Sequence, residues 1–297
     1  MLPGEYPRSG LLRGMQLEKE LGFNPYKFGM VGASDTHTGL TTPDHDNFFG
    51  KFTQYEPKPD RADHLSKENK ELGTKLYSWQ YIPAGLTAVW AAENTREAIF
   101  DAMARREVYA TSGPRIRVRF FGGFDFDEAD ANSRNLAQVG YSKGVPMGGD
   151  LMKAPAGKAP SFLVFALRDA MGANLDRVQI IKGWIDAAGK HHEKVYDVAW
   201  SGDRKAGADG KLPPVGNTVD PTVPTWTNTI GAAELGAVWT DPDFDPNQQA
   251  FYYARVIEIP TPRWTAYDQA RFNVDLPDDI PLITQERAYT SPIWYTP

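Results

Sequence analysis

Apolar residues recur at helical spacing early in the chain and at strand-like spacing later. Over residues 6–21 they fall mostly on one helical face, and Gly22 stands where a left-handed C-terminal cap belongs. This pattern predicts an amphipathic helix. Residues 28–33 then form a short apolar run between polar turn residues, which predicts a strand buried on both faces.

A second helix is predicted over residues 94–106. Asn94 and Glu97 have the spacing of a capping box, and Arg105 and Arg106 suit the negative end of a helix dipole. The expected apolar stripe consists of Ala98, Ile99, Ala102 and Met103.

From residue 116 onward the pattern is strand-like almost throughout. Short apolar or alternating segments are separated by Gly, Pro, Asn and Asp clusters, which is typical of a β-sandwich. Residues 182–195 indicate a hairpin with its turn at 186–189. The strands expected here cover residues 116–120, 162–167, 177–184, 193–200, 250–258 and 293–295.

Composition and charge narrow the classes of function. The chain has 297 residues and a net charge of -6, and its basic residues are not gathered into a patch that would follow a phosphate backbone, so we expect no nucleic-acid partner. The absence of cysteine excludes thiolate metal sites and cysteine nucleophiles. The apolar runs are far shorter than the ~20 residues that cross a bilayer, so no membrane span is expected. No signal peptide is evident, and the localisation is left open.

The strongest candidate for chemistry is the sequence Asp35-Thr36-His37. A carboxylate and an imidazole two residues apart, just past a predicted strand, can converge on one point if the backbone turns there. Gly32 and Gly39 on either side permit such turns. The spacing therefore favours a metal-ligand pair, although a capped turn produces the same pattern.

Other polar clusters carry weaker signals. Asp44, His45 and Asp46 suggest a substrate or metal contact at His45 and Asp46, with a solvated loop as the alternative. His64 lies in a charged stretch that we expect at the surface, and the adjacent His191 and His192 would point to opposite faces of a strand.

An acidic segment at residues 241–247 places oxygen ligands at alternate positions. It lacks the Gly and Glu of an EF-hand calcium loop, which favours a rigid acidic turn.

Several blocks together resemble a bacterial domain-of-unknown-function family, DUF3604, which is itself similar to the polymerase-and-histidinol-phosphatase (PHP) superfamily of metal-dependent hydrolases. The resemblance covers nearly the whole chain, in one order. The blocks are residues 32–39, 85–90, 94–100, 105–115, 179–184, 260–264 and 286–294.

The resemblance implies a distorted (βα)7 barrel that binds divalent ions, here Zn, Mn or Fe, at the carboxyl ends of its strands. The last ligand motif of that barrel is D-x-H, which matches Asp35 and His37. The earlier ligands, including an H-x-H motif, have no counterpart before Asp35, so the chain resembles the C-terminal part of a PHP-like protein. The expected fold class is α+β, with a barrel remnant and exit helix at 1–115 and an antiparallel β-sandwich at 116–297.

Two ligands are too few for a hydrolytic centre, which needs at least three and an open position for water. We therefore expect a phosphoester or related ester hydrolase that is not catalytically complete by itself. The exposed barrel edge would be covered by the missing N-terminal barrel portion or by self-association. An interface completed by His45 or His64 is a third hypothesis.

The alternative is a β-sandwich that binds a glycan or a protein partner without catalysis. Its candidate contacts would be exposed tryptophans, although large aromatic residues are usually part of a core. The tryptophans considered are Trp184, Trp200, Trp226, Trp239 and Trp264.

Overall fold

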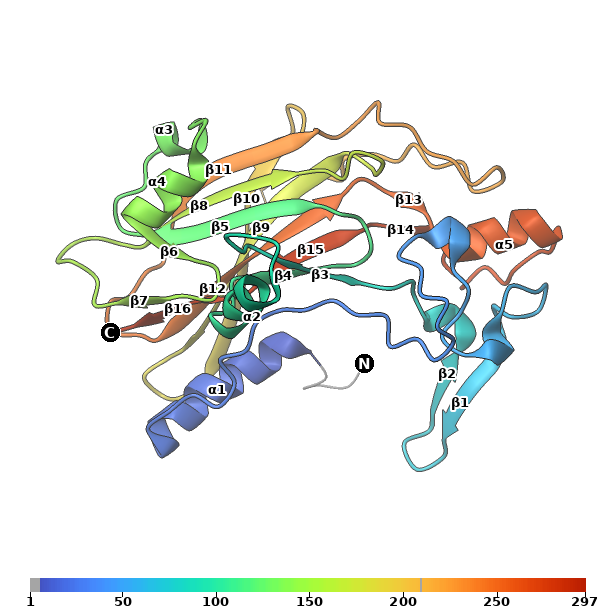
Figure 1. The fold of residues 1–297 in the computed structure, drawn as a ribbon, viewed down its shortest axis with the longest axis horizontal. Coiled ribbons are helices and arrows are strands. Elements are labelled where there is room, and N and C mark those ends of the chain that lie inside the picture. The colour runs from blue at the N-terminus through green and yellow to red at the C-terminus, as the bar shows by residue number, and fades with distance from the viewer. Residues whose placement is uncertain (1–5, 209) are drawn as a thin grey trace.

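Two β-sheets packed face to face form the body of the protein (Figure 1). The computed structural model describes residues 6–208 and 210–297. The larger sheet has the strand order β10-β9-β12-β15-β4-β3, and β16 pairs with both β12 and β7. Its strands are β3 (Leu86–Val89), β4 (Val108–Thr111), β7 (Asp150–Met152), β9 (Leu175–Ile185), β10 (His191–Trp200), β12 (Ala250–Glu258), β15 (Arg287–Thr290) and β16 (Ile293–Thr296).

The smaller sheet has the order β11-β8-β5-β6 and is antiparallel throughout. Each strand predicted beyond residue 116 is present, with ends that differ by a few residues. The hairpin β9-β10 is also confirmed, and Gly189 in its turn has a φ of 80°. The strands of this sheet are β5 (Arg117–Gly123), β6 (Gly144–Pro146), β8 (Ser161–Leu167) and β11 (Glu234–Thr240).

The main core lies between the two sheets. Alternate residues of β9 and β12 point inward, so Val178 and Ile180 meet the continuous apolar run of β8. The rings of Phe162 and Tyr252 lie 4.4 Å apart at the centre of this layer. The sandwich therefore rests on the burial of large aromatic and branched side chains.

The helix α1 (Pro7–Leu21) covers part of the opposite face of the larger sheet. Its buried residues Leu11 and Met15 pack with Ile181 and Phe251, and Gly22 ends the helix with a φ of 79°. The predicted helix and its glycine cap are confirmed. This face of the sheet is thereby shielded by the first helix of the chain.

The predicted strand at residues 28–33 is wrong. The segment is extended, but it joins no strand ladder and instead crosses the sheet, with Val31 58% exposed. Its backbone is held by side chains, because Met30 N–H donates to Ser291 Oγ at 2.9 Å and Thr87 Oγ1 donates to the Gly32 carbonyl at 2.7 Å. The apolar run therefore indicates a segment that packs against a sheet, and not a strand of that sheet.

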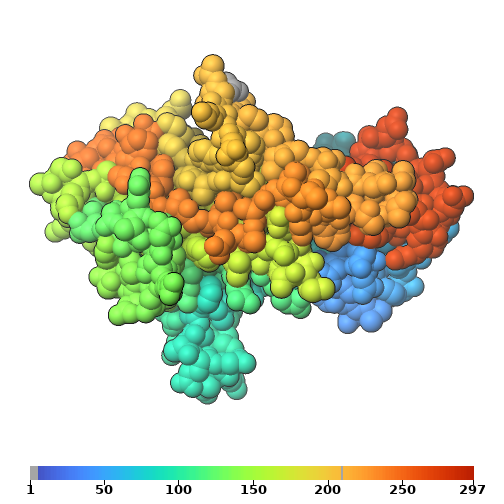
Figure 2. Space-filling model, turned by 90° about the horizontal axis from the view of Figure 1, so that it is seen from above, coloured from blue at the N-terminus to red at the C-terminus, as the bar shows by residue number. Residues whose placement is uncertain are grey.

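The second predicted helix is α2 (Arg96–Ala104), and its cap differs from the prediction. Thr95, not Asn94, is the N-cap, because its Oγ1 accepts the Ala98 N–H at 3.2 Å. Of the expected apolar stripe, Met103 is exposed. The cyan segment that carries α2 projects from the body in Figure 2.

A smaller layer lies beyond one end of the sandwich. It contains the hairpin β1 (Leu65–Asn69) and β2 (Thr74–Tyr77), the helix α5 (Trp264–Phe272) and the pair β13 (Thr261–Pro262) and β14 (Ile283–Thr284). Three short 3₁₀ helices belong to the same region: η1 (His45–Asn47), η2 (Thr53–Tyr55) and η3 (Ser78–Gln80).

The buried pair of Arg61 and Asp268 joins the 45–64 loop to α5. Arg61 belongs to the charged stretch around His64, which was expected at the surface, and its side chain is instead 2% exposed.

The part beyond residue 116 is less uniformly strand than the pattern indicates, since it also contains α5, α3 (Glu128–Ala131) and α4 (Leu136–Lys143). The described residues form a mixed α and β fold with several sheets and no closed barrel. β4 pairs with β15, so strands on both sides of residue 116 share one sheet. The division into 1–115 and 116–297 stays a prediction. None of the helices in the described ranges has the length and apolar character needed to cross a membrane.

Candidate functional site

The Asp35-Thr36-His37 segment forms a tight turn after the extended crossing segment. Asp35 has a φ of 48°, a left-handed conformation that is uncommon for a residue other than glycine. This turn brings His37 Nδ1 to 3.0 Å from the Asp35 carbonyl oxygen. Because a carbonyl can only accept, the hydrogen bond places a proton on Nδ1 and leaves the Nε2 lone pair of the neutral ring free.

Lys51 holds the other side of this turn. Its ammonium forms an ion pair with the Asp35 carboxylate, and its carbonyl accepts the His37 N–H at 2.8 Å. The hydrogen bond and charge of Lys51 lower the pKa of Asp35. The Asp35 carboxylate is 73% exposed, so this ion pair is solvent-screened and a divalent ion can compete with it.

The His37 ring lies against Phe52, with 4.5 Å between the ring centroids. The two ring planes are tilted by 31° to each other, so Phe52 packs against the imidazole. The imidazole is therefore oriented by one backbone hydrogen bond and one aromatic neighbour, while the residue as a whole stays exposed.

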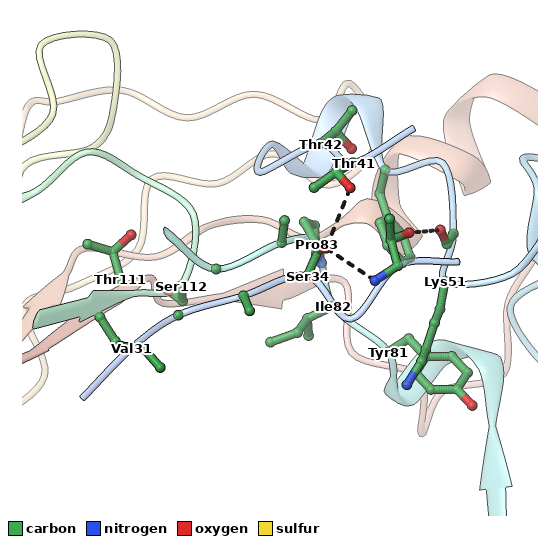
Figure 3. Close-up of a pocket in the computed structure, with 18 of the residues that line it drawn as sticks. Val31, Ser34, Thr41, Thr42, Lys51, Tyr81, Ile82, Pro83, Thr111 and Ser112 are labelled. Carbon is green, nitrogen blue, oxygen red and sulfur yellow. Dashed lines mark hydrogen bonds between the residues drawn. The ribbon is translucent and has the colours of Figure 1, made fainter. Parts of the chain in front are cut away.

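A cavity of about 420 Å³ lies beside the turn. Its wall includes the hydroxyl groups of Ser34 and Thr41, and Lys51 reaches along it toward Tyr81 (Figure 3). Gly32 is required here, because a Cβ on it would lie 2.5 Å from the Leu86 carbonyl oxygen. The backbone is thus closely packed at Gly32, which belongs to the wall of the cavity.

The turn supplies two donors of the types that bind metal ions, a carboxylate and an imidazole. Within the described residues, no group of three or more His, Cys, Asp or Glu side chains is arranged to hold a metal ion. Asp35 and His37 are ligand types for at most two positions of a coordination shell, and a complete shell needs further ligands.

The structure places His45 and Asp46 at a different cavity. His45 is held at both ring nitrogens: Nε2 lies 2.6 Å from Glu286 Oε1, and Nδ1 lies 3.0 Å from the Trp264 backbone nitrogen. The Trp264 N–H must donate to Nδ1, so the proton of the neutral ring is on Nε2. In this arrangement neither nitrogen has a lone pair left for an ion.

This second cavity has a volume of about 450 Å³ and a strongly acidic wall. Glu258 is 1% exposed, and burial followed by the charges of Glu286 and Asp169 raises its pKa well above the usual range. Glu286 is engaged at both oxygens, by His45 and by Ser112 Oγ. The acidic residues of the wall are Asp44, Asp46, Asp169, Glu258 and Glu286.

The remaining histidines and the acidic segment are held by ordinary contacts. His64 is exposed, as predicted, and His192 Nε2 lies 2.7 Å from Asp186 Oδ2. In the 241–247 segment, Asp241 pairs with Lys182 at 2.6 Å and Asp243 with Lys194. Lysines thus neutralise carboxylates that a calcium ion would require.

The tryptophans considered for a binding face are mostly engaged in packing. Trp264 is 1% exposed, and its indole N–H donates to the Tyr81 carbonyl at 2.9 Å. Trp184 stacks on His192 at 5.1 Å, and the others are partly buried. The alternative of a binding module therefore stays a prediction without a specific contact in its favour.

Sequence reasoning missed Lys51, Ser112, Glu258 and Glu286. A signal existed for Glu258, because the period of two along β12 places it on the same face as the core residues Tyr252 and Val256. A carboxylate in that register is a buried charge that needs an explanation. Lys51 had no comparable signal, since its contact with Asp35 depends on the path of the loop.

Comparison with known families decides the relationship of the chain. The family described as "Protein of unknown function (DUF3604)" matches residues 1–297. The chain belongs to this family. Searches of curated proteins and of solved structures found no match. For this DUF3604 chain, the residues that line the first and second cavities therefore provide the evidence on function.

Proposed function

We propose that this DUF3604 chain contributes Asp35 and His37 to the divalent-metal centre of a PHP-like hydrolase of phosphoesters or related esters, with Zn, Mn or Fe as the ion. The observation that carries the proposal is the hydrogen bond from His37 Nδ1 to the Asp35 carbonyl. Metal-binding histidines typically donate their second ring N–H to a carbonyl or carboxylate, which orients the free nitrogen.

When bound, the ion would supply Lewis acidity and a nucleophilic water. The residues of this chain have separate roles. Asp35 and His37 would hold the ion, and the left-handed backbone at Asp35 keeps the two groups on one turn. Lys51, released from Asp35 by the ion, would face the first cavity, where its ammonium and the hydroxyls of Ser34 and Thr41 suit the oxygens of an anionic ester.

The remaining ligands would come from the N-terminal barrel portion of a PHP-like protein or from a second copy. The crossing segment supports this part of the proposal, because its backbone joins no ladder and its neighbours are exposed apolar residues. Val31, Leu40 and Ile82 are each more than half exposed beside the first cavity. A covering element there would remove apolar surface from water.

Titration of the chain with Mn²⁺, followed by electron paramagnetic resonance and by the NMR signals of His37, tests the proposal. We expect weak one-to-one binding that broadens the His37 ring signals, lost in Asp35→Asn and His37→Gln. His64→Gln is the matched control, because His64 is an exposed histidine outside the turn. Mn²⁺ binding that survives both turn variants would refute the assignment.

Activity tests the incompleteness of the site separately. We expect the chain alone to hydrolyse p-nitrophenyl phosphate no faster with Mn²⁺ or Zn²⁺ than without. Rapid metal-dependent turnover that disappears in His37→Gln would show that two ligands plus unrecognised groups suffice.

A further inference from the structure

The second cavity has no role in the proposed hydrolase, and we propose that it binds a small organic cation, an alkylammonium or a guanidinium. The site lies between the 43–46 segment, the 169–173 loop and the ends of β12 and β15. Its volume of about 450 Å³ falls in the range of small-molecule pockets.

The charge of the wall selects for a cation. Five carboxyl groups line the cavity, and Arg115 is the one Lys or Arg in that described wall. The carboxylate of Asp169 is used internally, since it accepts from the backbone N–H groups of Arg115 and Met171 at 2.7 and 3.0 Å. Glu286 is likewise engaged, by His45 and Ser112. The acceptors left for a ligand are Asp44, Asp46 and Glu258.

Glu258 is the second, independent sign of a ligand. Its side chain lies at the buried end of the cavity, and Oε1 is a buried atom without a hydrogen-bond partner among the described residues. A buried polar atom without a partner is unfavourable, because it has lost its hydrogen bonds to water and gained none in the protein. An N–H donor from a ligand would supply the missing hydrogen bond. Oε1 lies beside Gly172, since a Cβ built on that glycine would be 3.5 Å from Oε1.

The chemistry of the wall distinguishes among cations. The carboxyl groups do not form a cluster of three that can hold a metal ion within the described part of the chain. The side chains of Trp226 and Tyr267 line the cavity, and aromatic faces attract organic cations. Burial, followed by the charges of Asp46 and Asp44, raises the pKa of the Tyr267 hydroxyl.

Binding has a proton balance that can be measured. Glu258 is surrounded by Glu286 and Asp169, which oppose its ionisation, and by Arg168, which favours it more weakly. Burial, followed by the charges of Glu286 and Asp169, raises the pKa of its carboxyl and so favours the protonated form when no ligand is present. A bound cation would favour the carboxylate, so the Glu258 O–H bond breaks, the proton passes to the buffer, and the ammonium or guanidinium N–H donates to the resulting oxygen.

Isothermal titration calorimetry of the full chain at pH 7 with agmatine and with n-butylamine, each in two buffers of different ionisation enthalpy, tests the proposal. We expect saturable binding with release of protons, up to one for each amine bound. Glu258→Gln should bind about 10- to 100-fold more weakly without proton release, because its amide oxygen still accepts the ligand N–H but carries no negative charge to strengthen that hydrogen bond. This variant keeps the shape of the side chain, so a circular dichroism spectrum and melting curve verify that it folds.

Glu234→Gln is the matched control, because Glu234 is exposed on β11 and outside the cavity. It should bind as the unmodified chain does, and 1-butanol and butyrate should not bind. The proposal is overturned if neither amine binds saturably, if butyrate or Mn²⁺ binds in place of the amines, or if Glu258→Gln binds with unchanged affinity. Loss of metal binding in the Asp35 and His37 variants leaves these results unaffected, so the two proposals fail separately.

Discussion

Removing the negative charge from the buried Arg61–Asp268 pair is expected to destabilise the smaller layer that lies beyond one end of the sandwich. Arg61 is 2% and Asp268 3% exposed. The guanidinium donates through Nη2 to Asp268 Oδ1 at 2.9 Å and through Nε to Oδ2. Its Nη1 also donates to the carbonyls of Phe48 and Tyr55, at 2.9 and 3.1 Å. These bonds enclose the loop from which Lys51 reaches Asp35.

The expected loss of unfolding free energy follows from the groups that remain buried in Asp268→Asn. The amide keeps one acceptor but leaves the Arg61 charge buried without a counter-charge. Breaking a buried pair in this way typically costs 3–5 kcal/mol, and the retained acceptor favours the lower end, about 3 kcal/mol. Asp60→Asn is the matched control, since Asp60 lies 3.6 Å from Lys58 with its side chain 75% exposed. Loss of such a surface pair costs well below about 1 kcal/mol.

Urea and thermal unfolding of the three chains, followed by tryptophan fluorescence, provide the assay. The Arg61 guanidinium lies 4.5 Å from the Trp264 ring centroid, so this ring reports on the layer directly. For a chain of this size, about 3 kcal/mol corresponds to a melting temperature lower by roughly 6–12 °C. The reasoning is refuted if Asp268→Asn unfolds at the same urea concentration and temperature as Asp60→Asn.

Three further predictions concern single side chains. Ser291→Ala removes the acceptor of the Met30 N–H from a fully buried position, so we expect a loss of about 1–3 kcal/mol and faster hydrogen exchange at Met30; unchanged exchange there would contradict the contact. Gly32→Ala places a Cβ 2.5 Å from the Leu86 carbonyl oxygen and should cost about 1–3 kcal/mol; an unaltered melting temperature would show that the crossing segment shifts freely. Burial raises the pKa of Glu258 above its ordinary 4.5, so above that pH the unfolded chain loses a proton that the folded chain keeps. The free energy of unfolding should then fall, relative to that of Glu258→Gln, by up to about 1.4 kcal/mol per pH unit until the pH reaches the pKa of Glu258 in the folded chain. A difference in unfolding free energy between the two chains that stays constant from pH 5 to 7, measured by urea unfolding, would disprove this.

The sequence allowed the sandwich strands to be predicted because their signals are local. The continuous apolar run of β8 and the alternation in β12 depend only on which faces are buried. The crossing segment at residues 28–33 carries the same kind of apolar run, yet it packs on a sheet without joining it. The pattern of apolar residues indicates which side chains are buried, but it does not show which groups pair with the backbone N–H and C=O. This segment was therefore predicted wrongly.

The candidate site shows the same limit. The Asp35-His37 spacing was readable, but the tautomer of His37 is set by the backbone of the turn. The engagement of His45 by Glu286 joins positions 241 residues apart, and no local pattern indicates such a contact. The buried Glu258 was visible in principle, because the period of β12 assigns it to a core-facing position.

The pairing of β4 with β15 affects how the chain can fold while it is being synthesised. More than half of the chain lies between Thr111 and its partner Ala288. During synthesis, β3 and β4 therefore lack their partner β15 until residue 288 has emerged from the ribosome. Contacts so distant in sequence slow folding and leave edges open to wrong pairing. Newly made chains should accordingly depend more on chaperones than a sandwich built from consecutive hairpins.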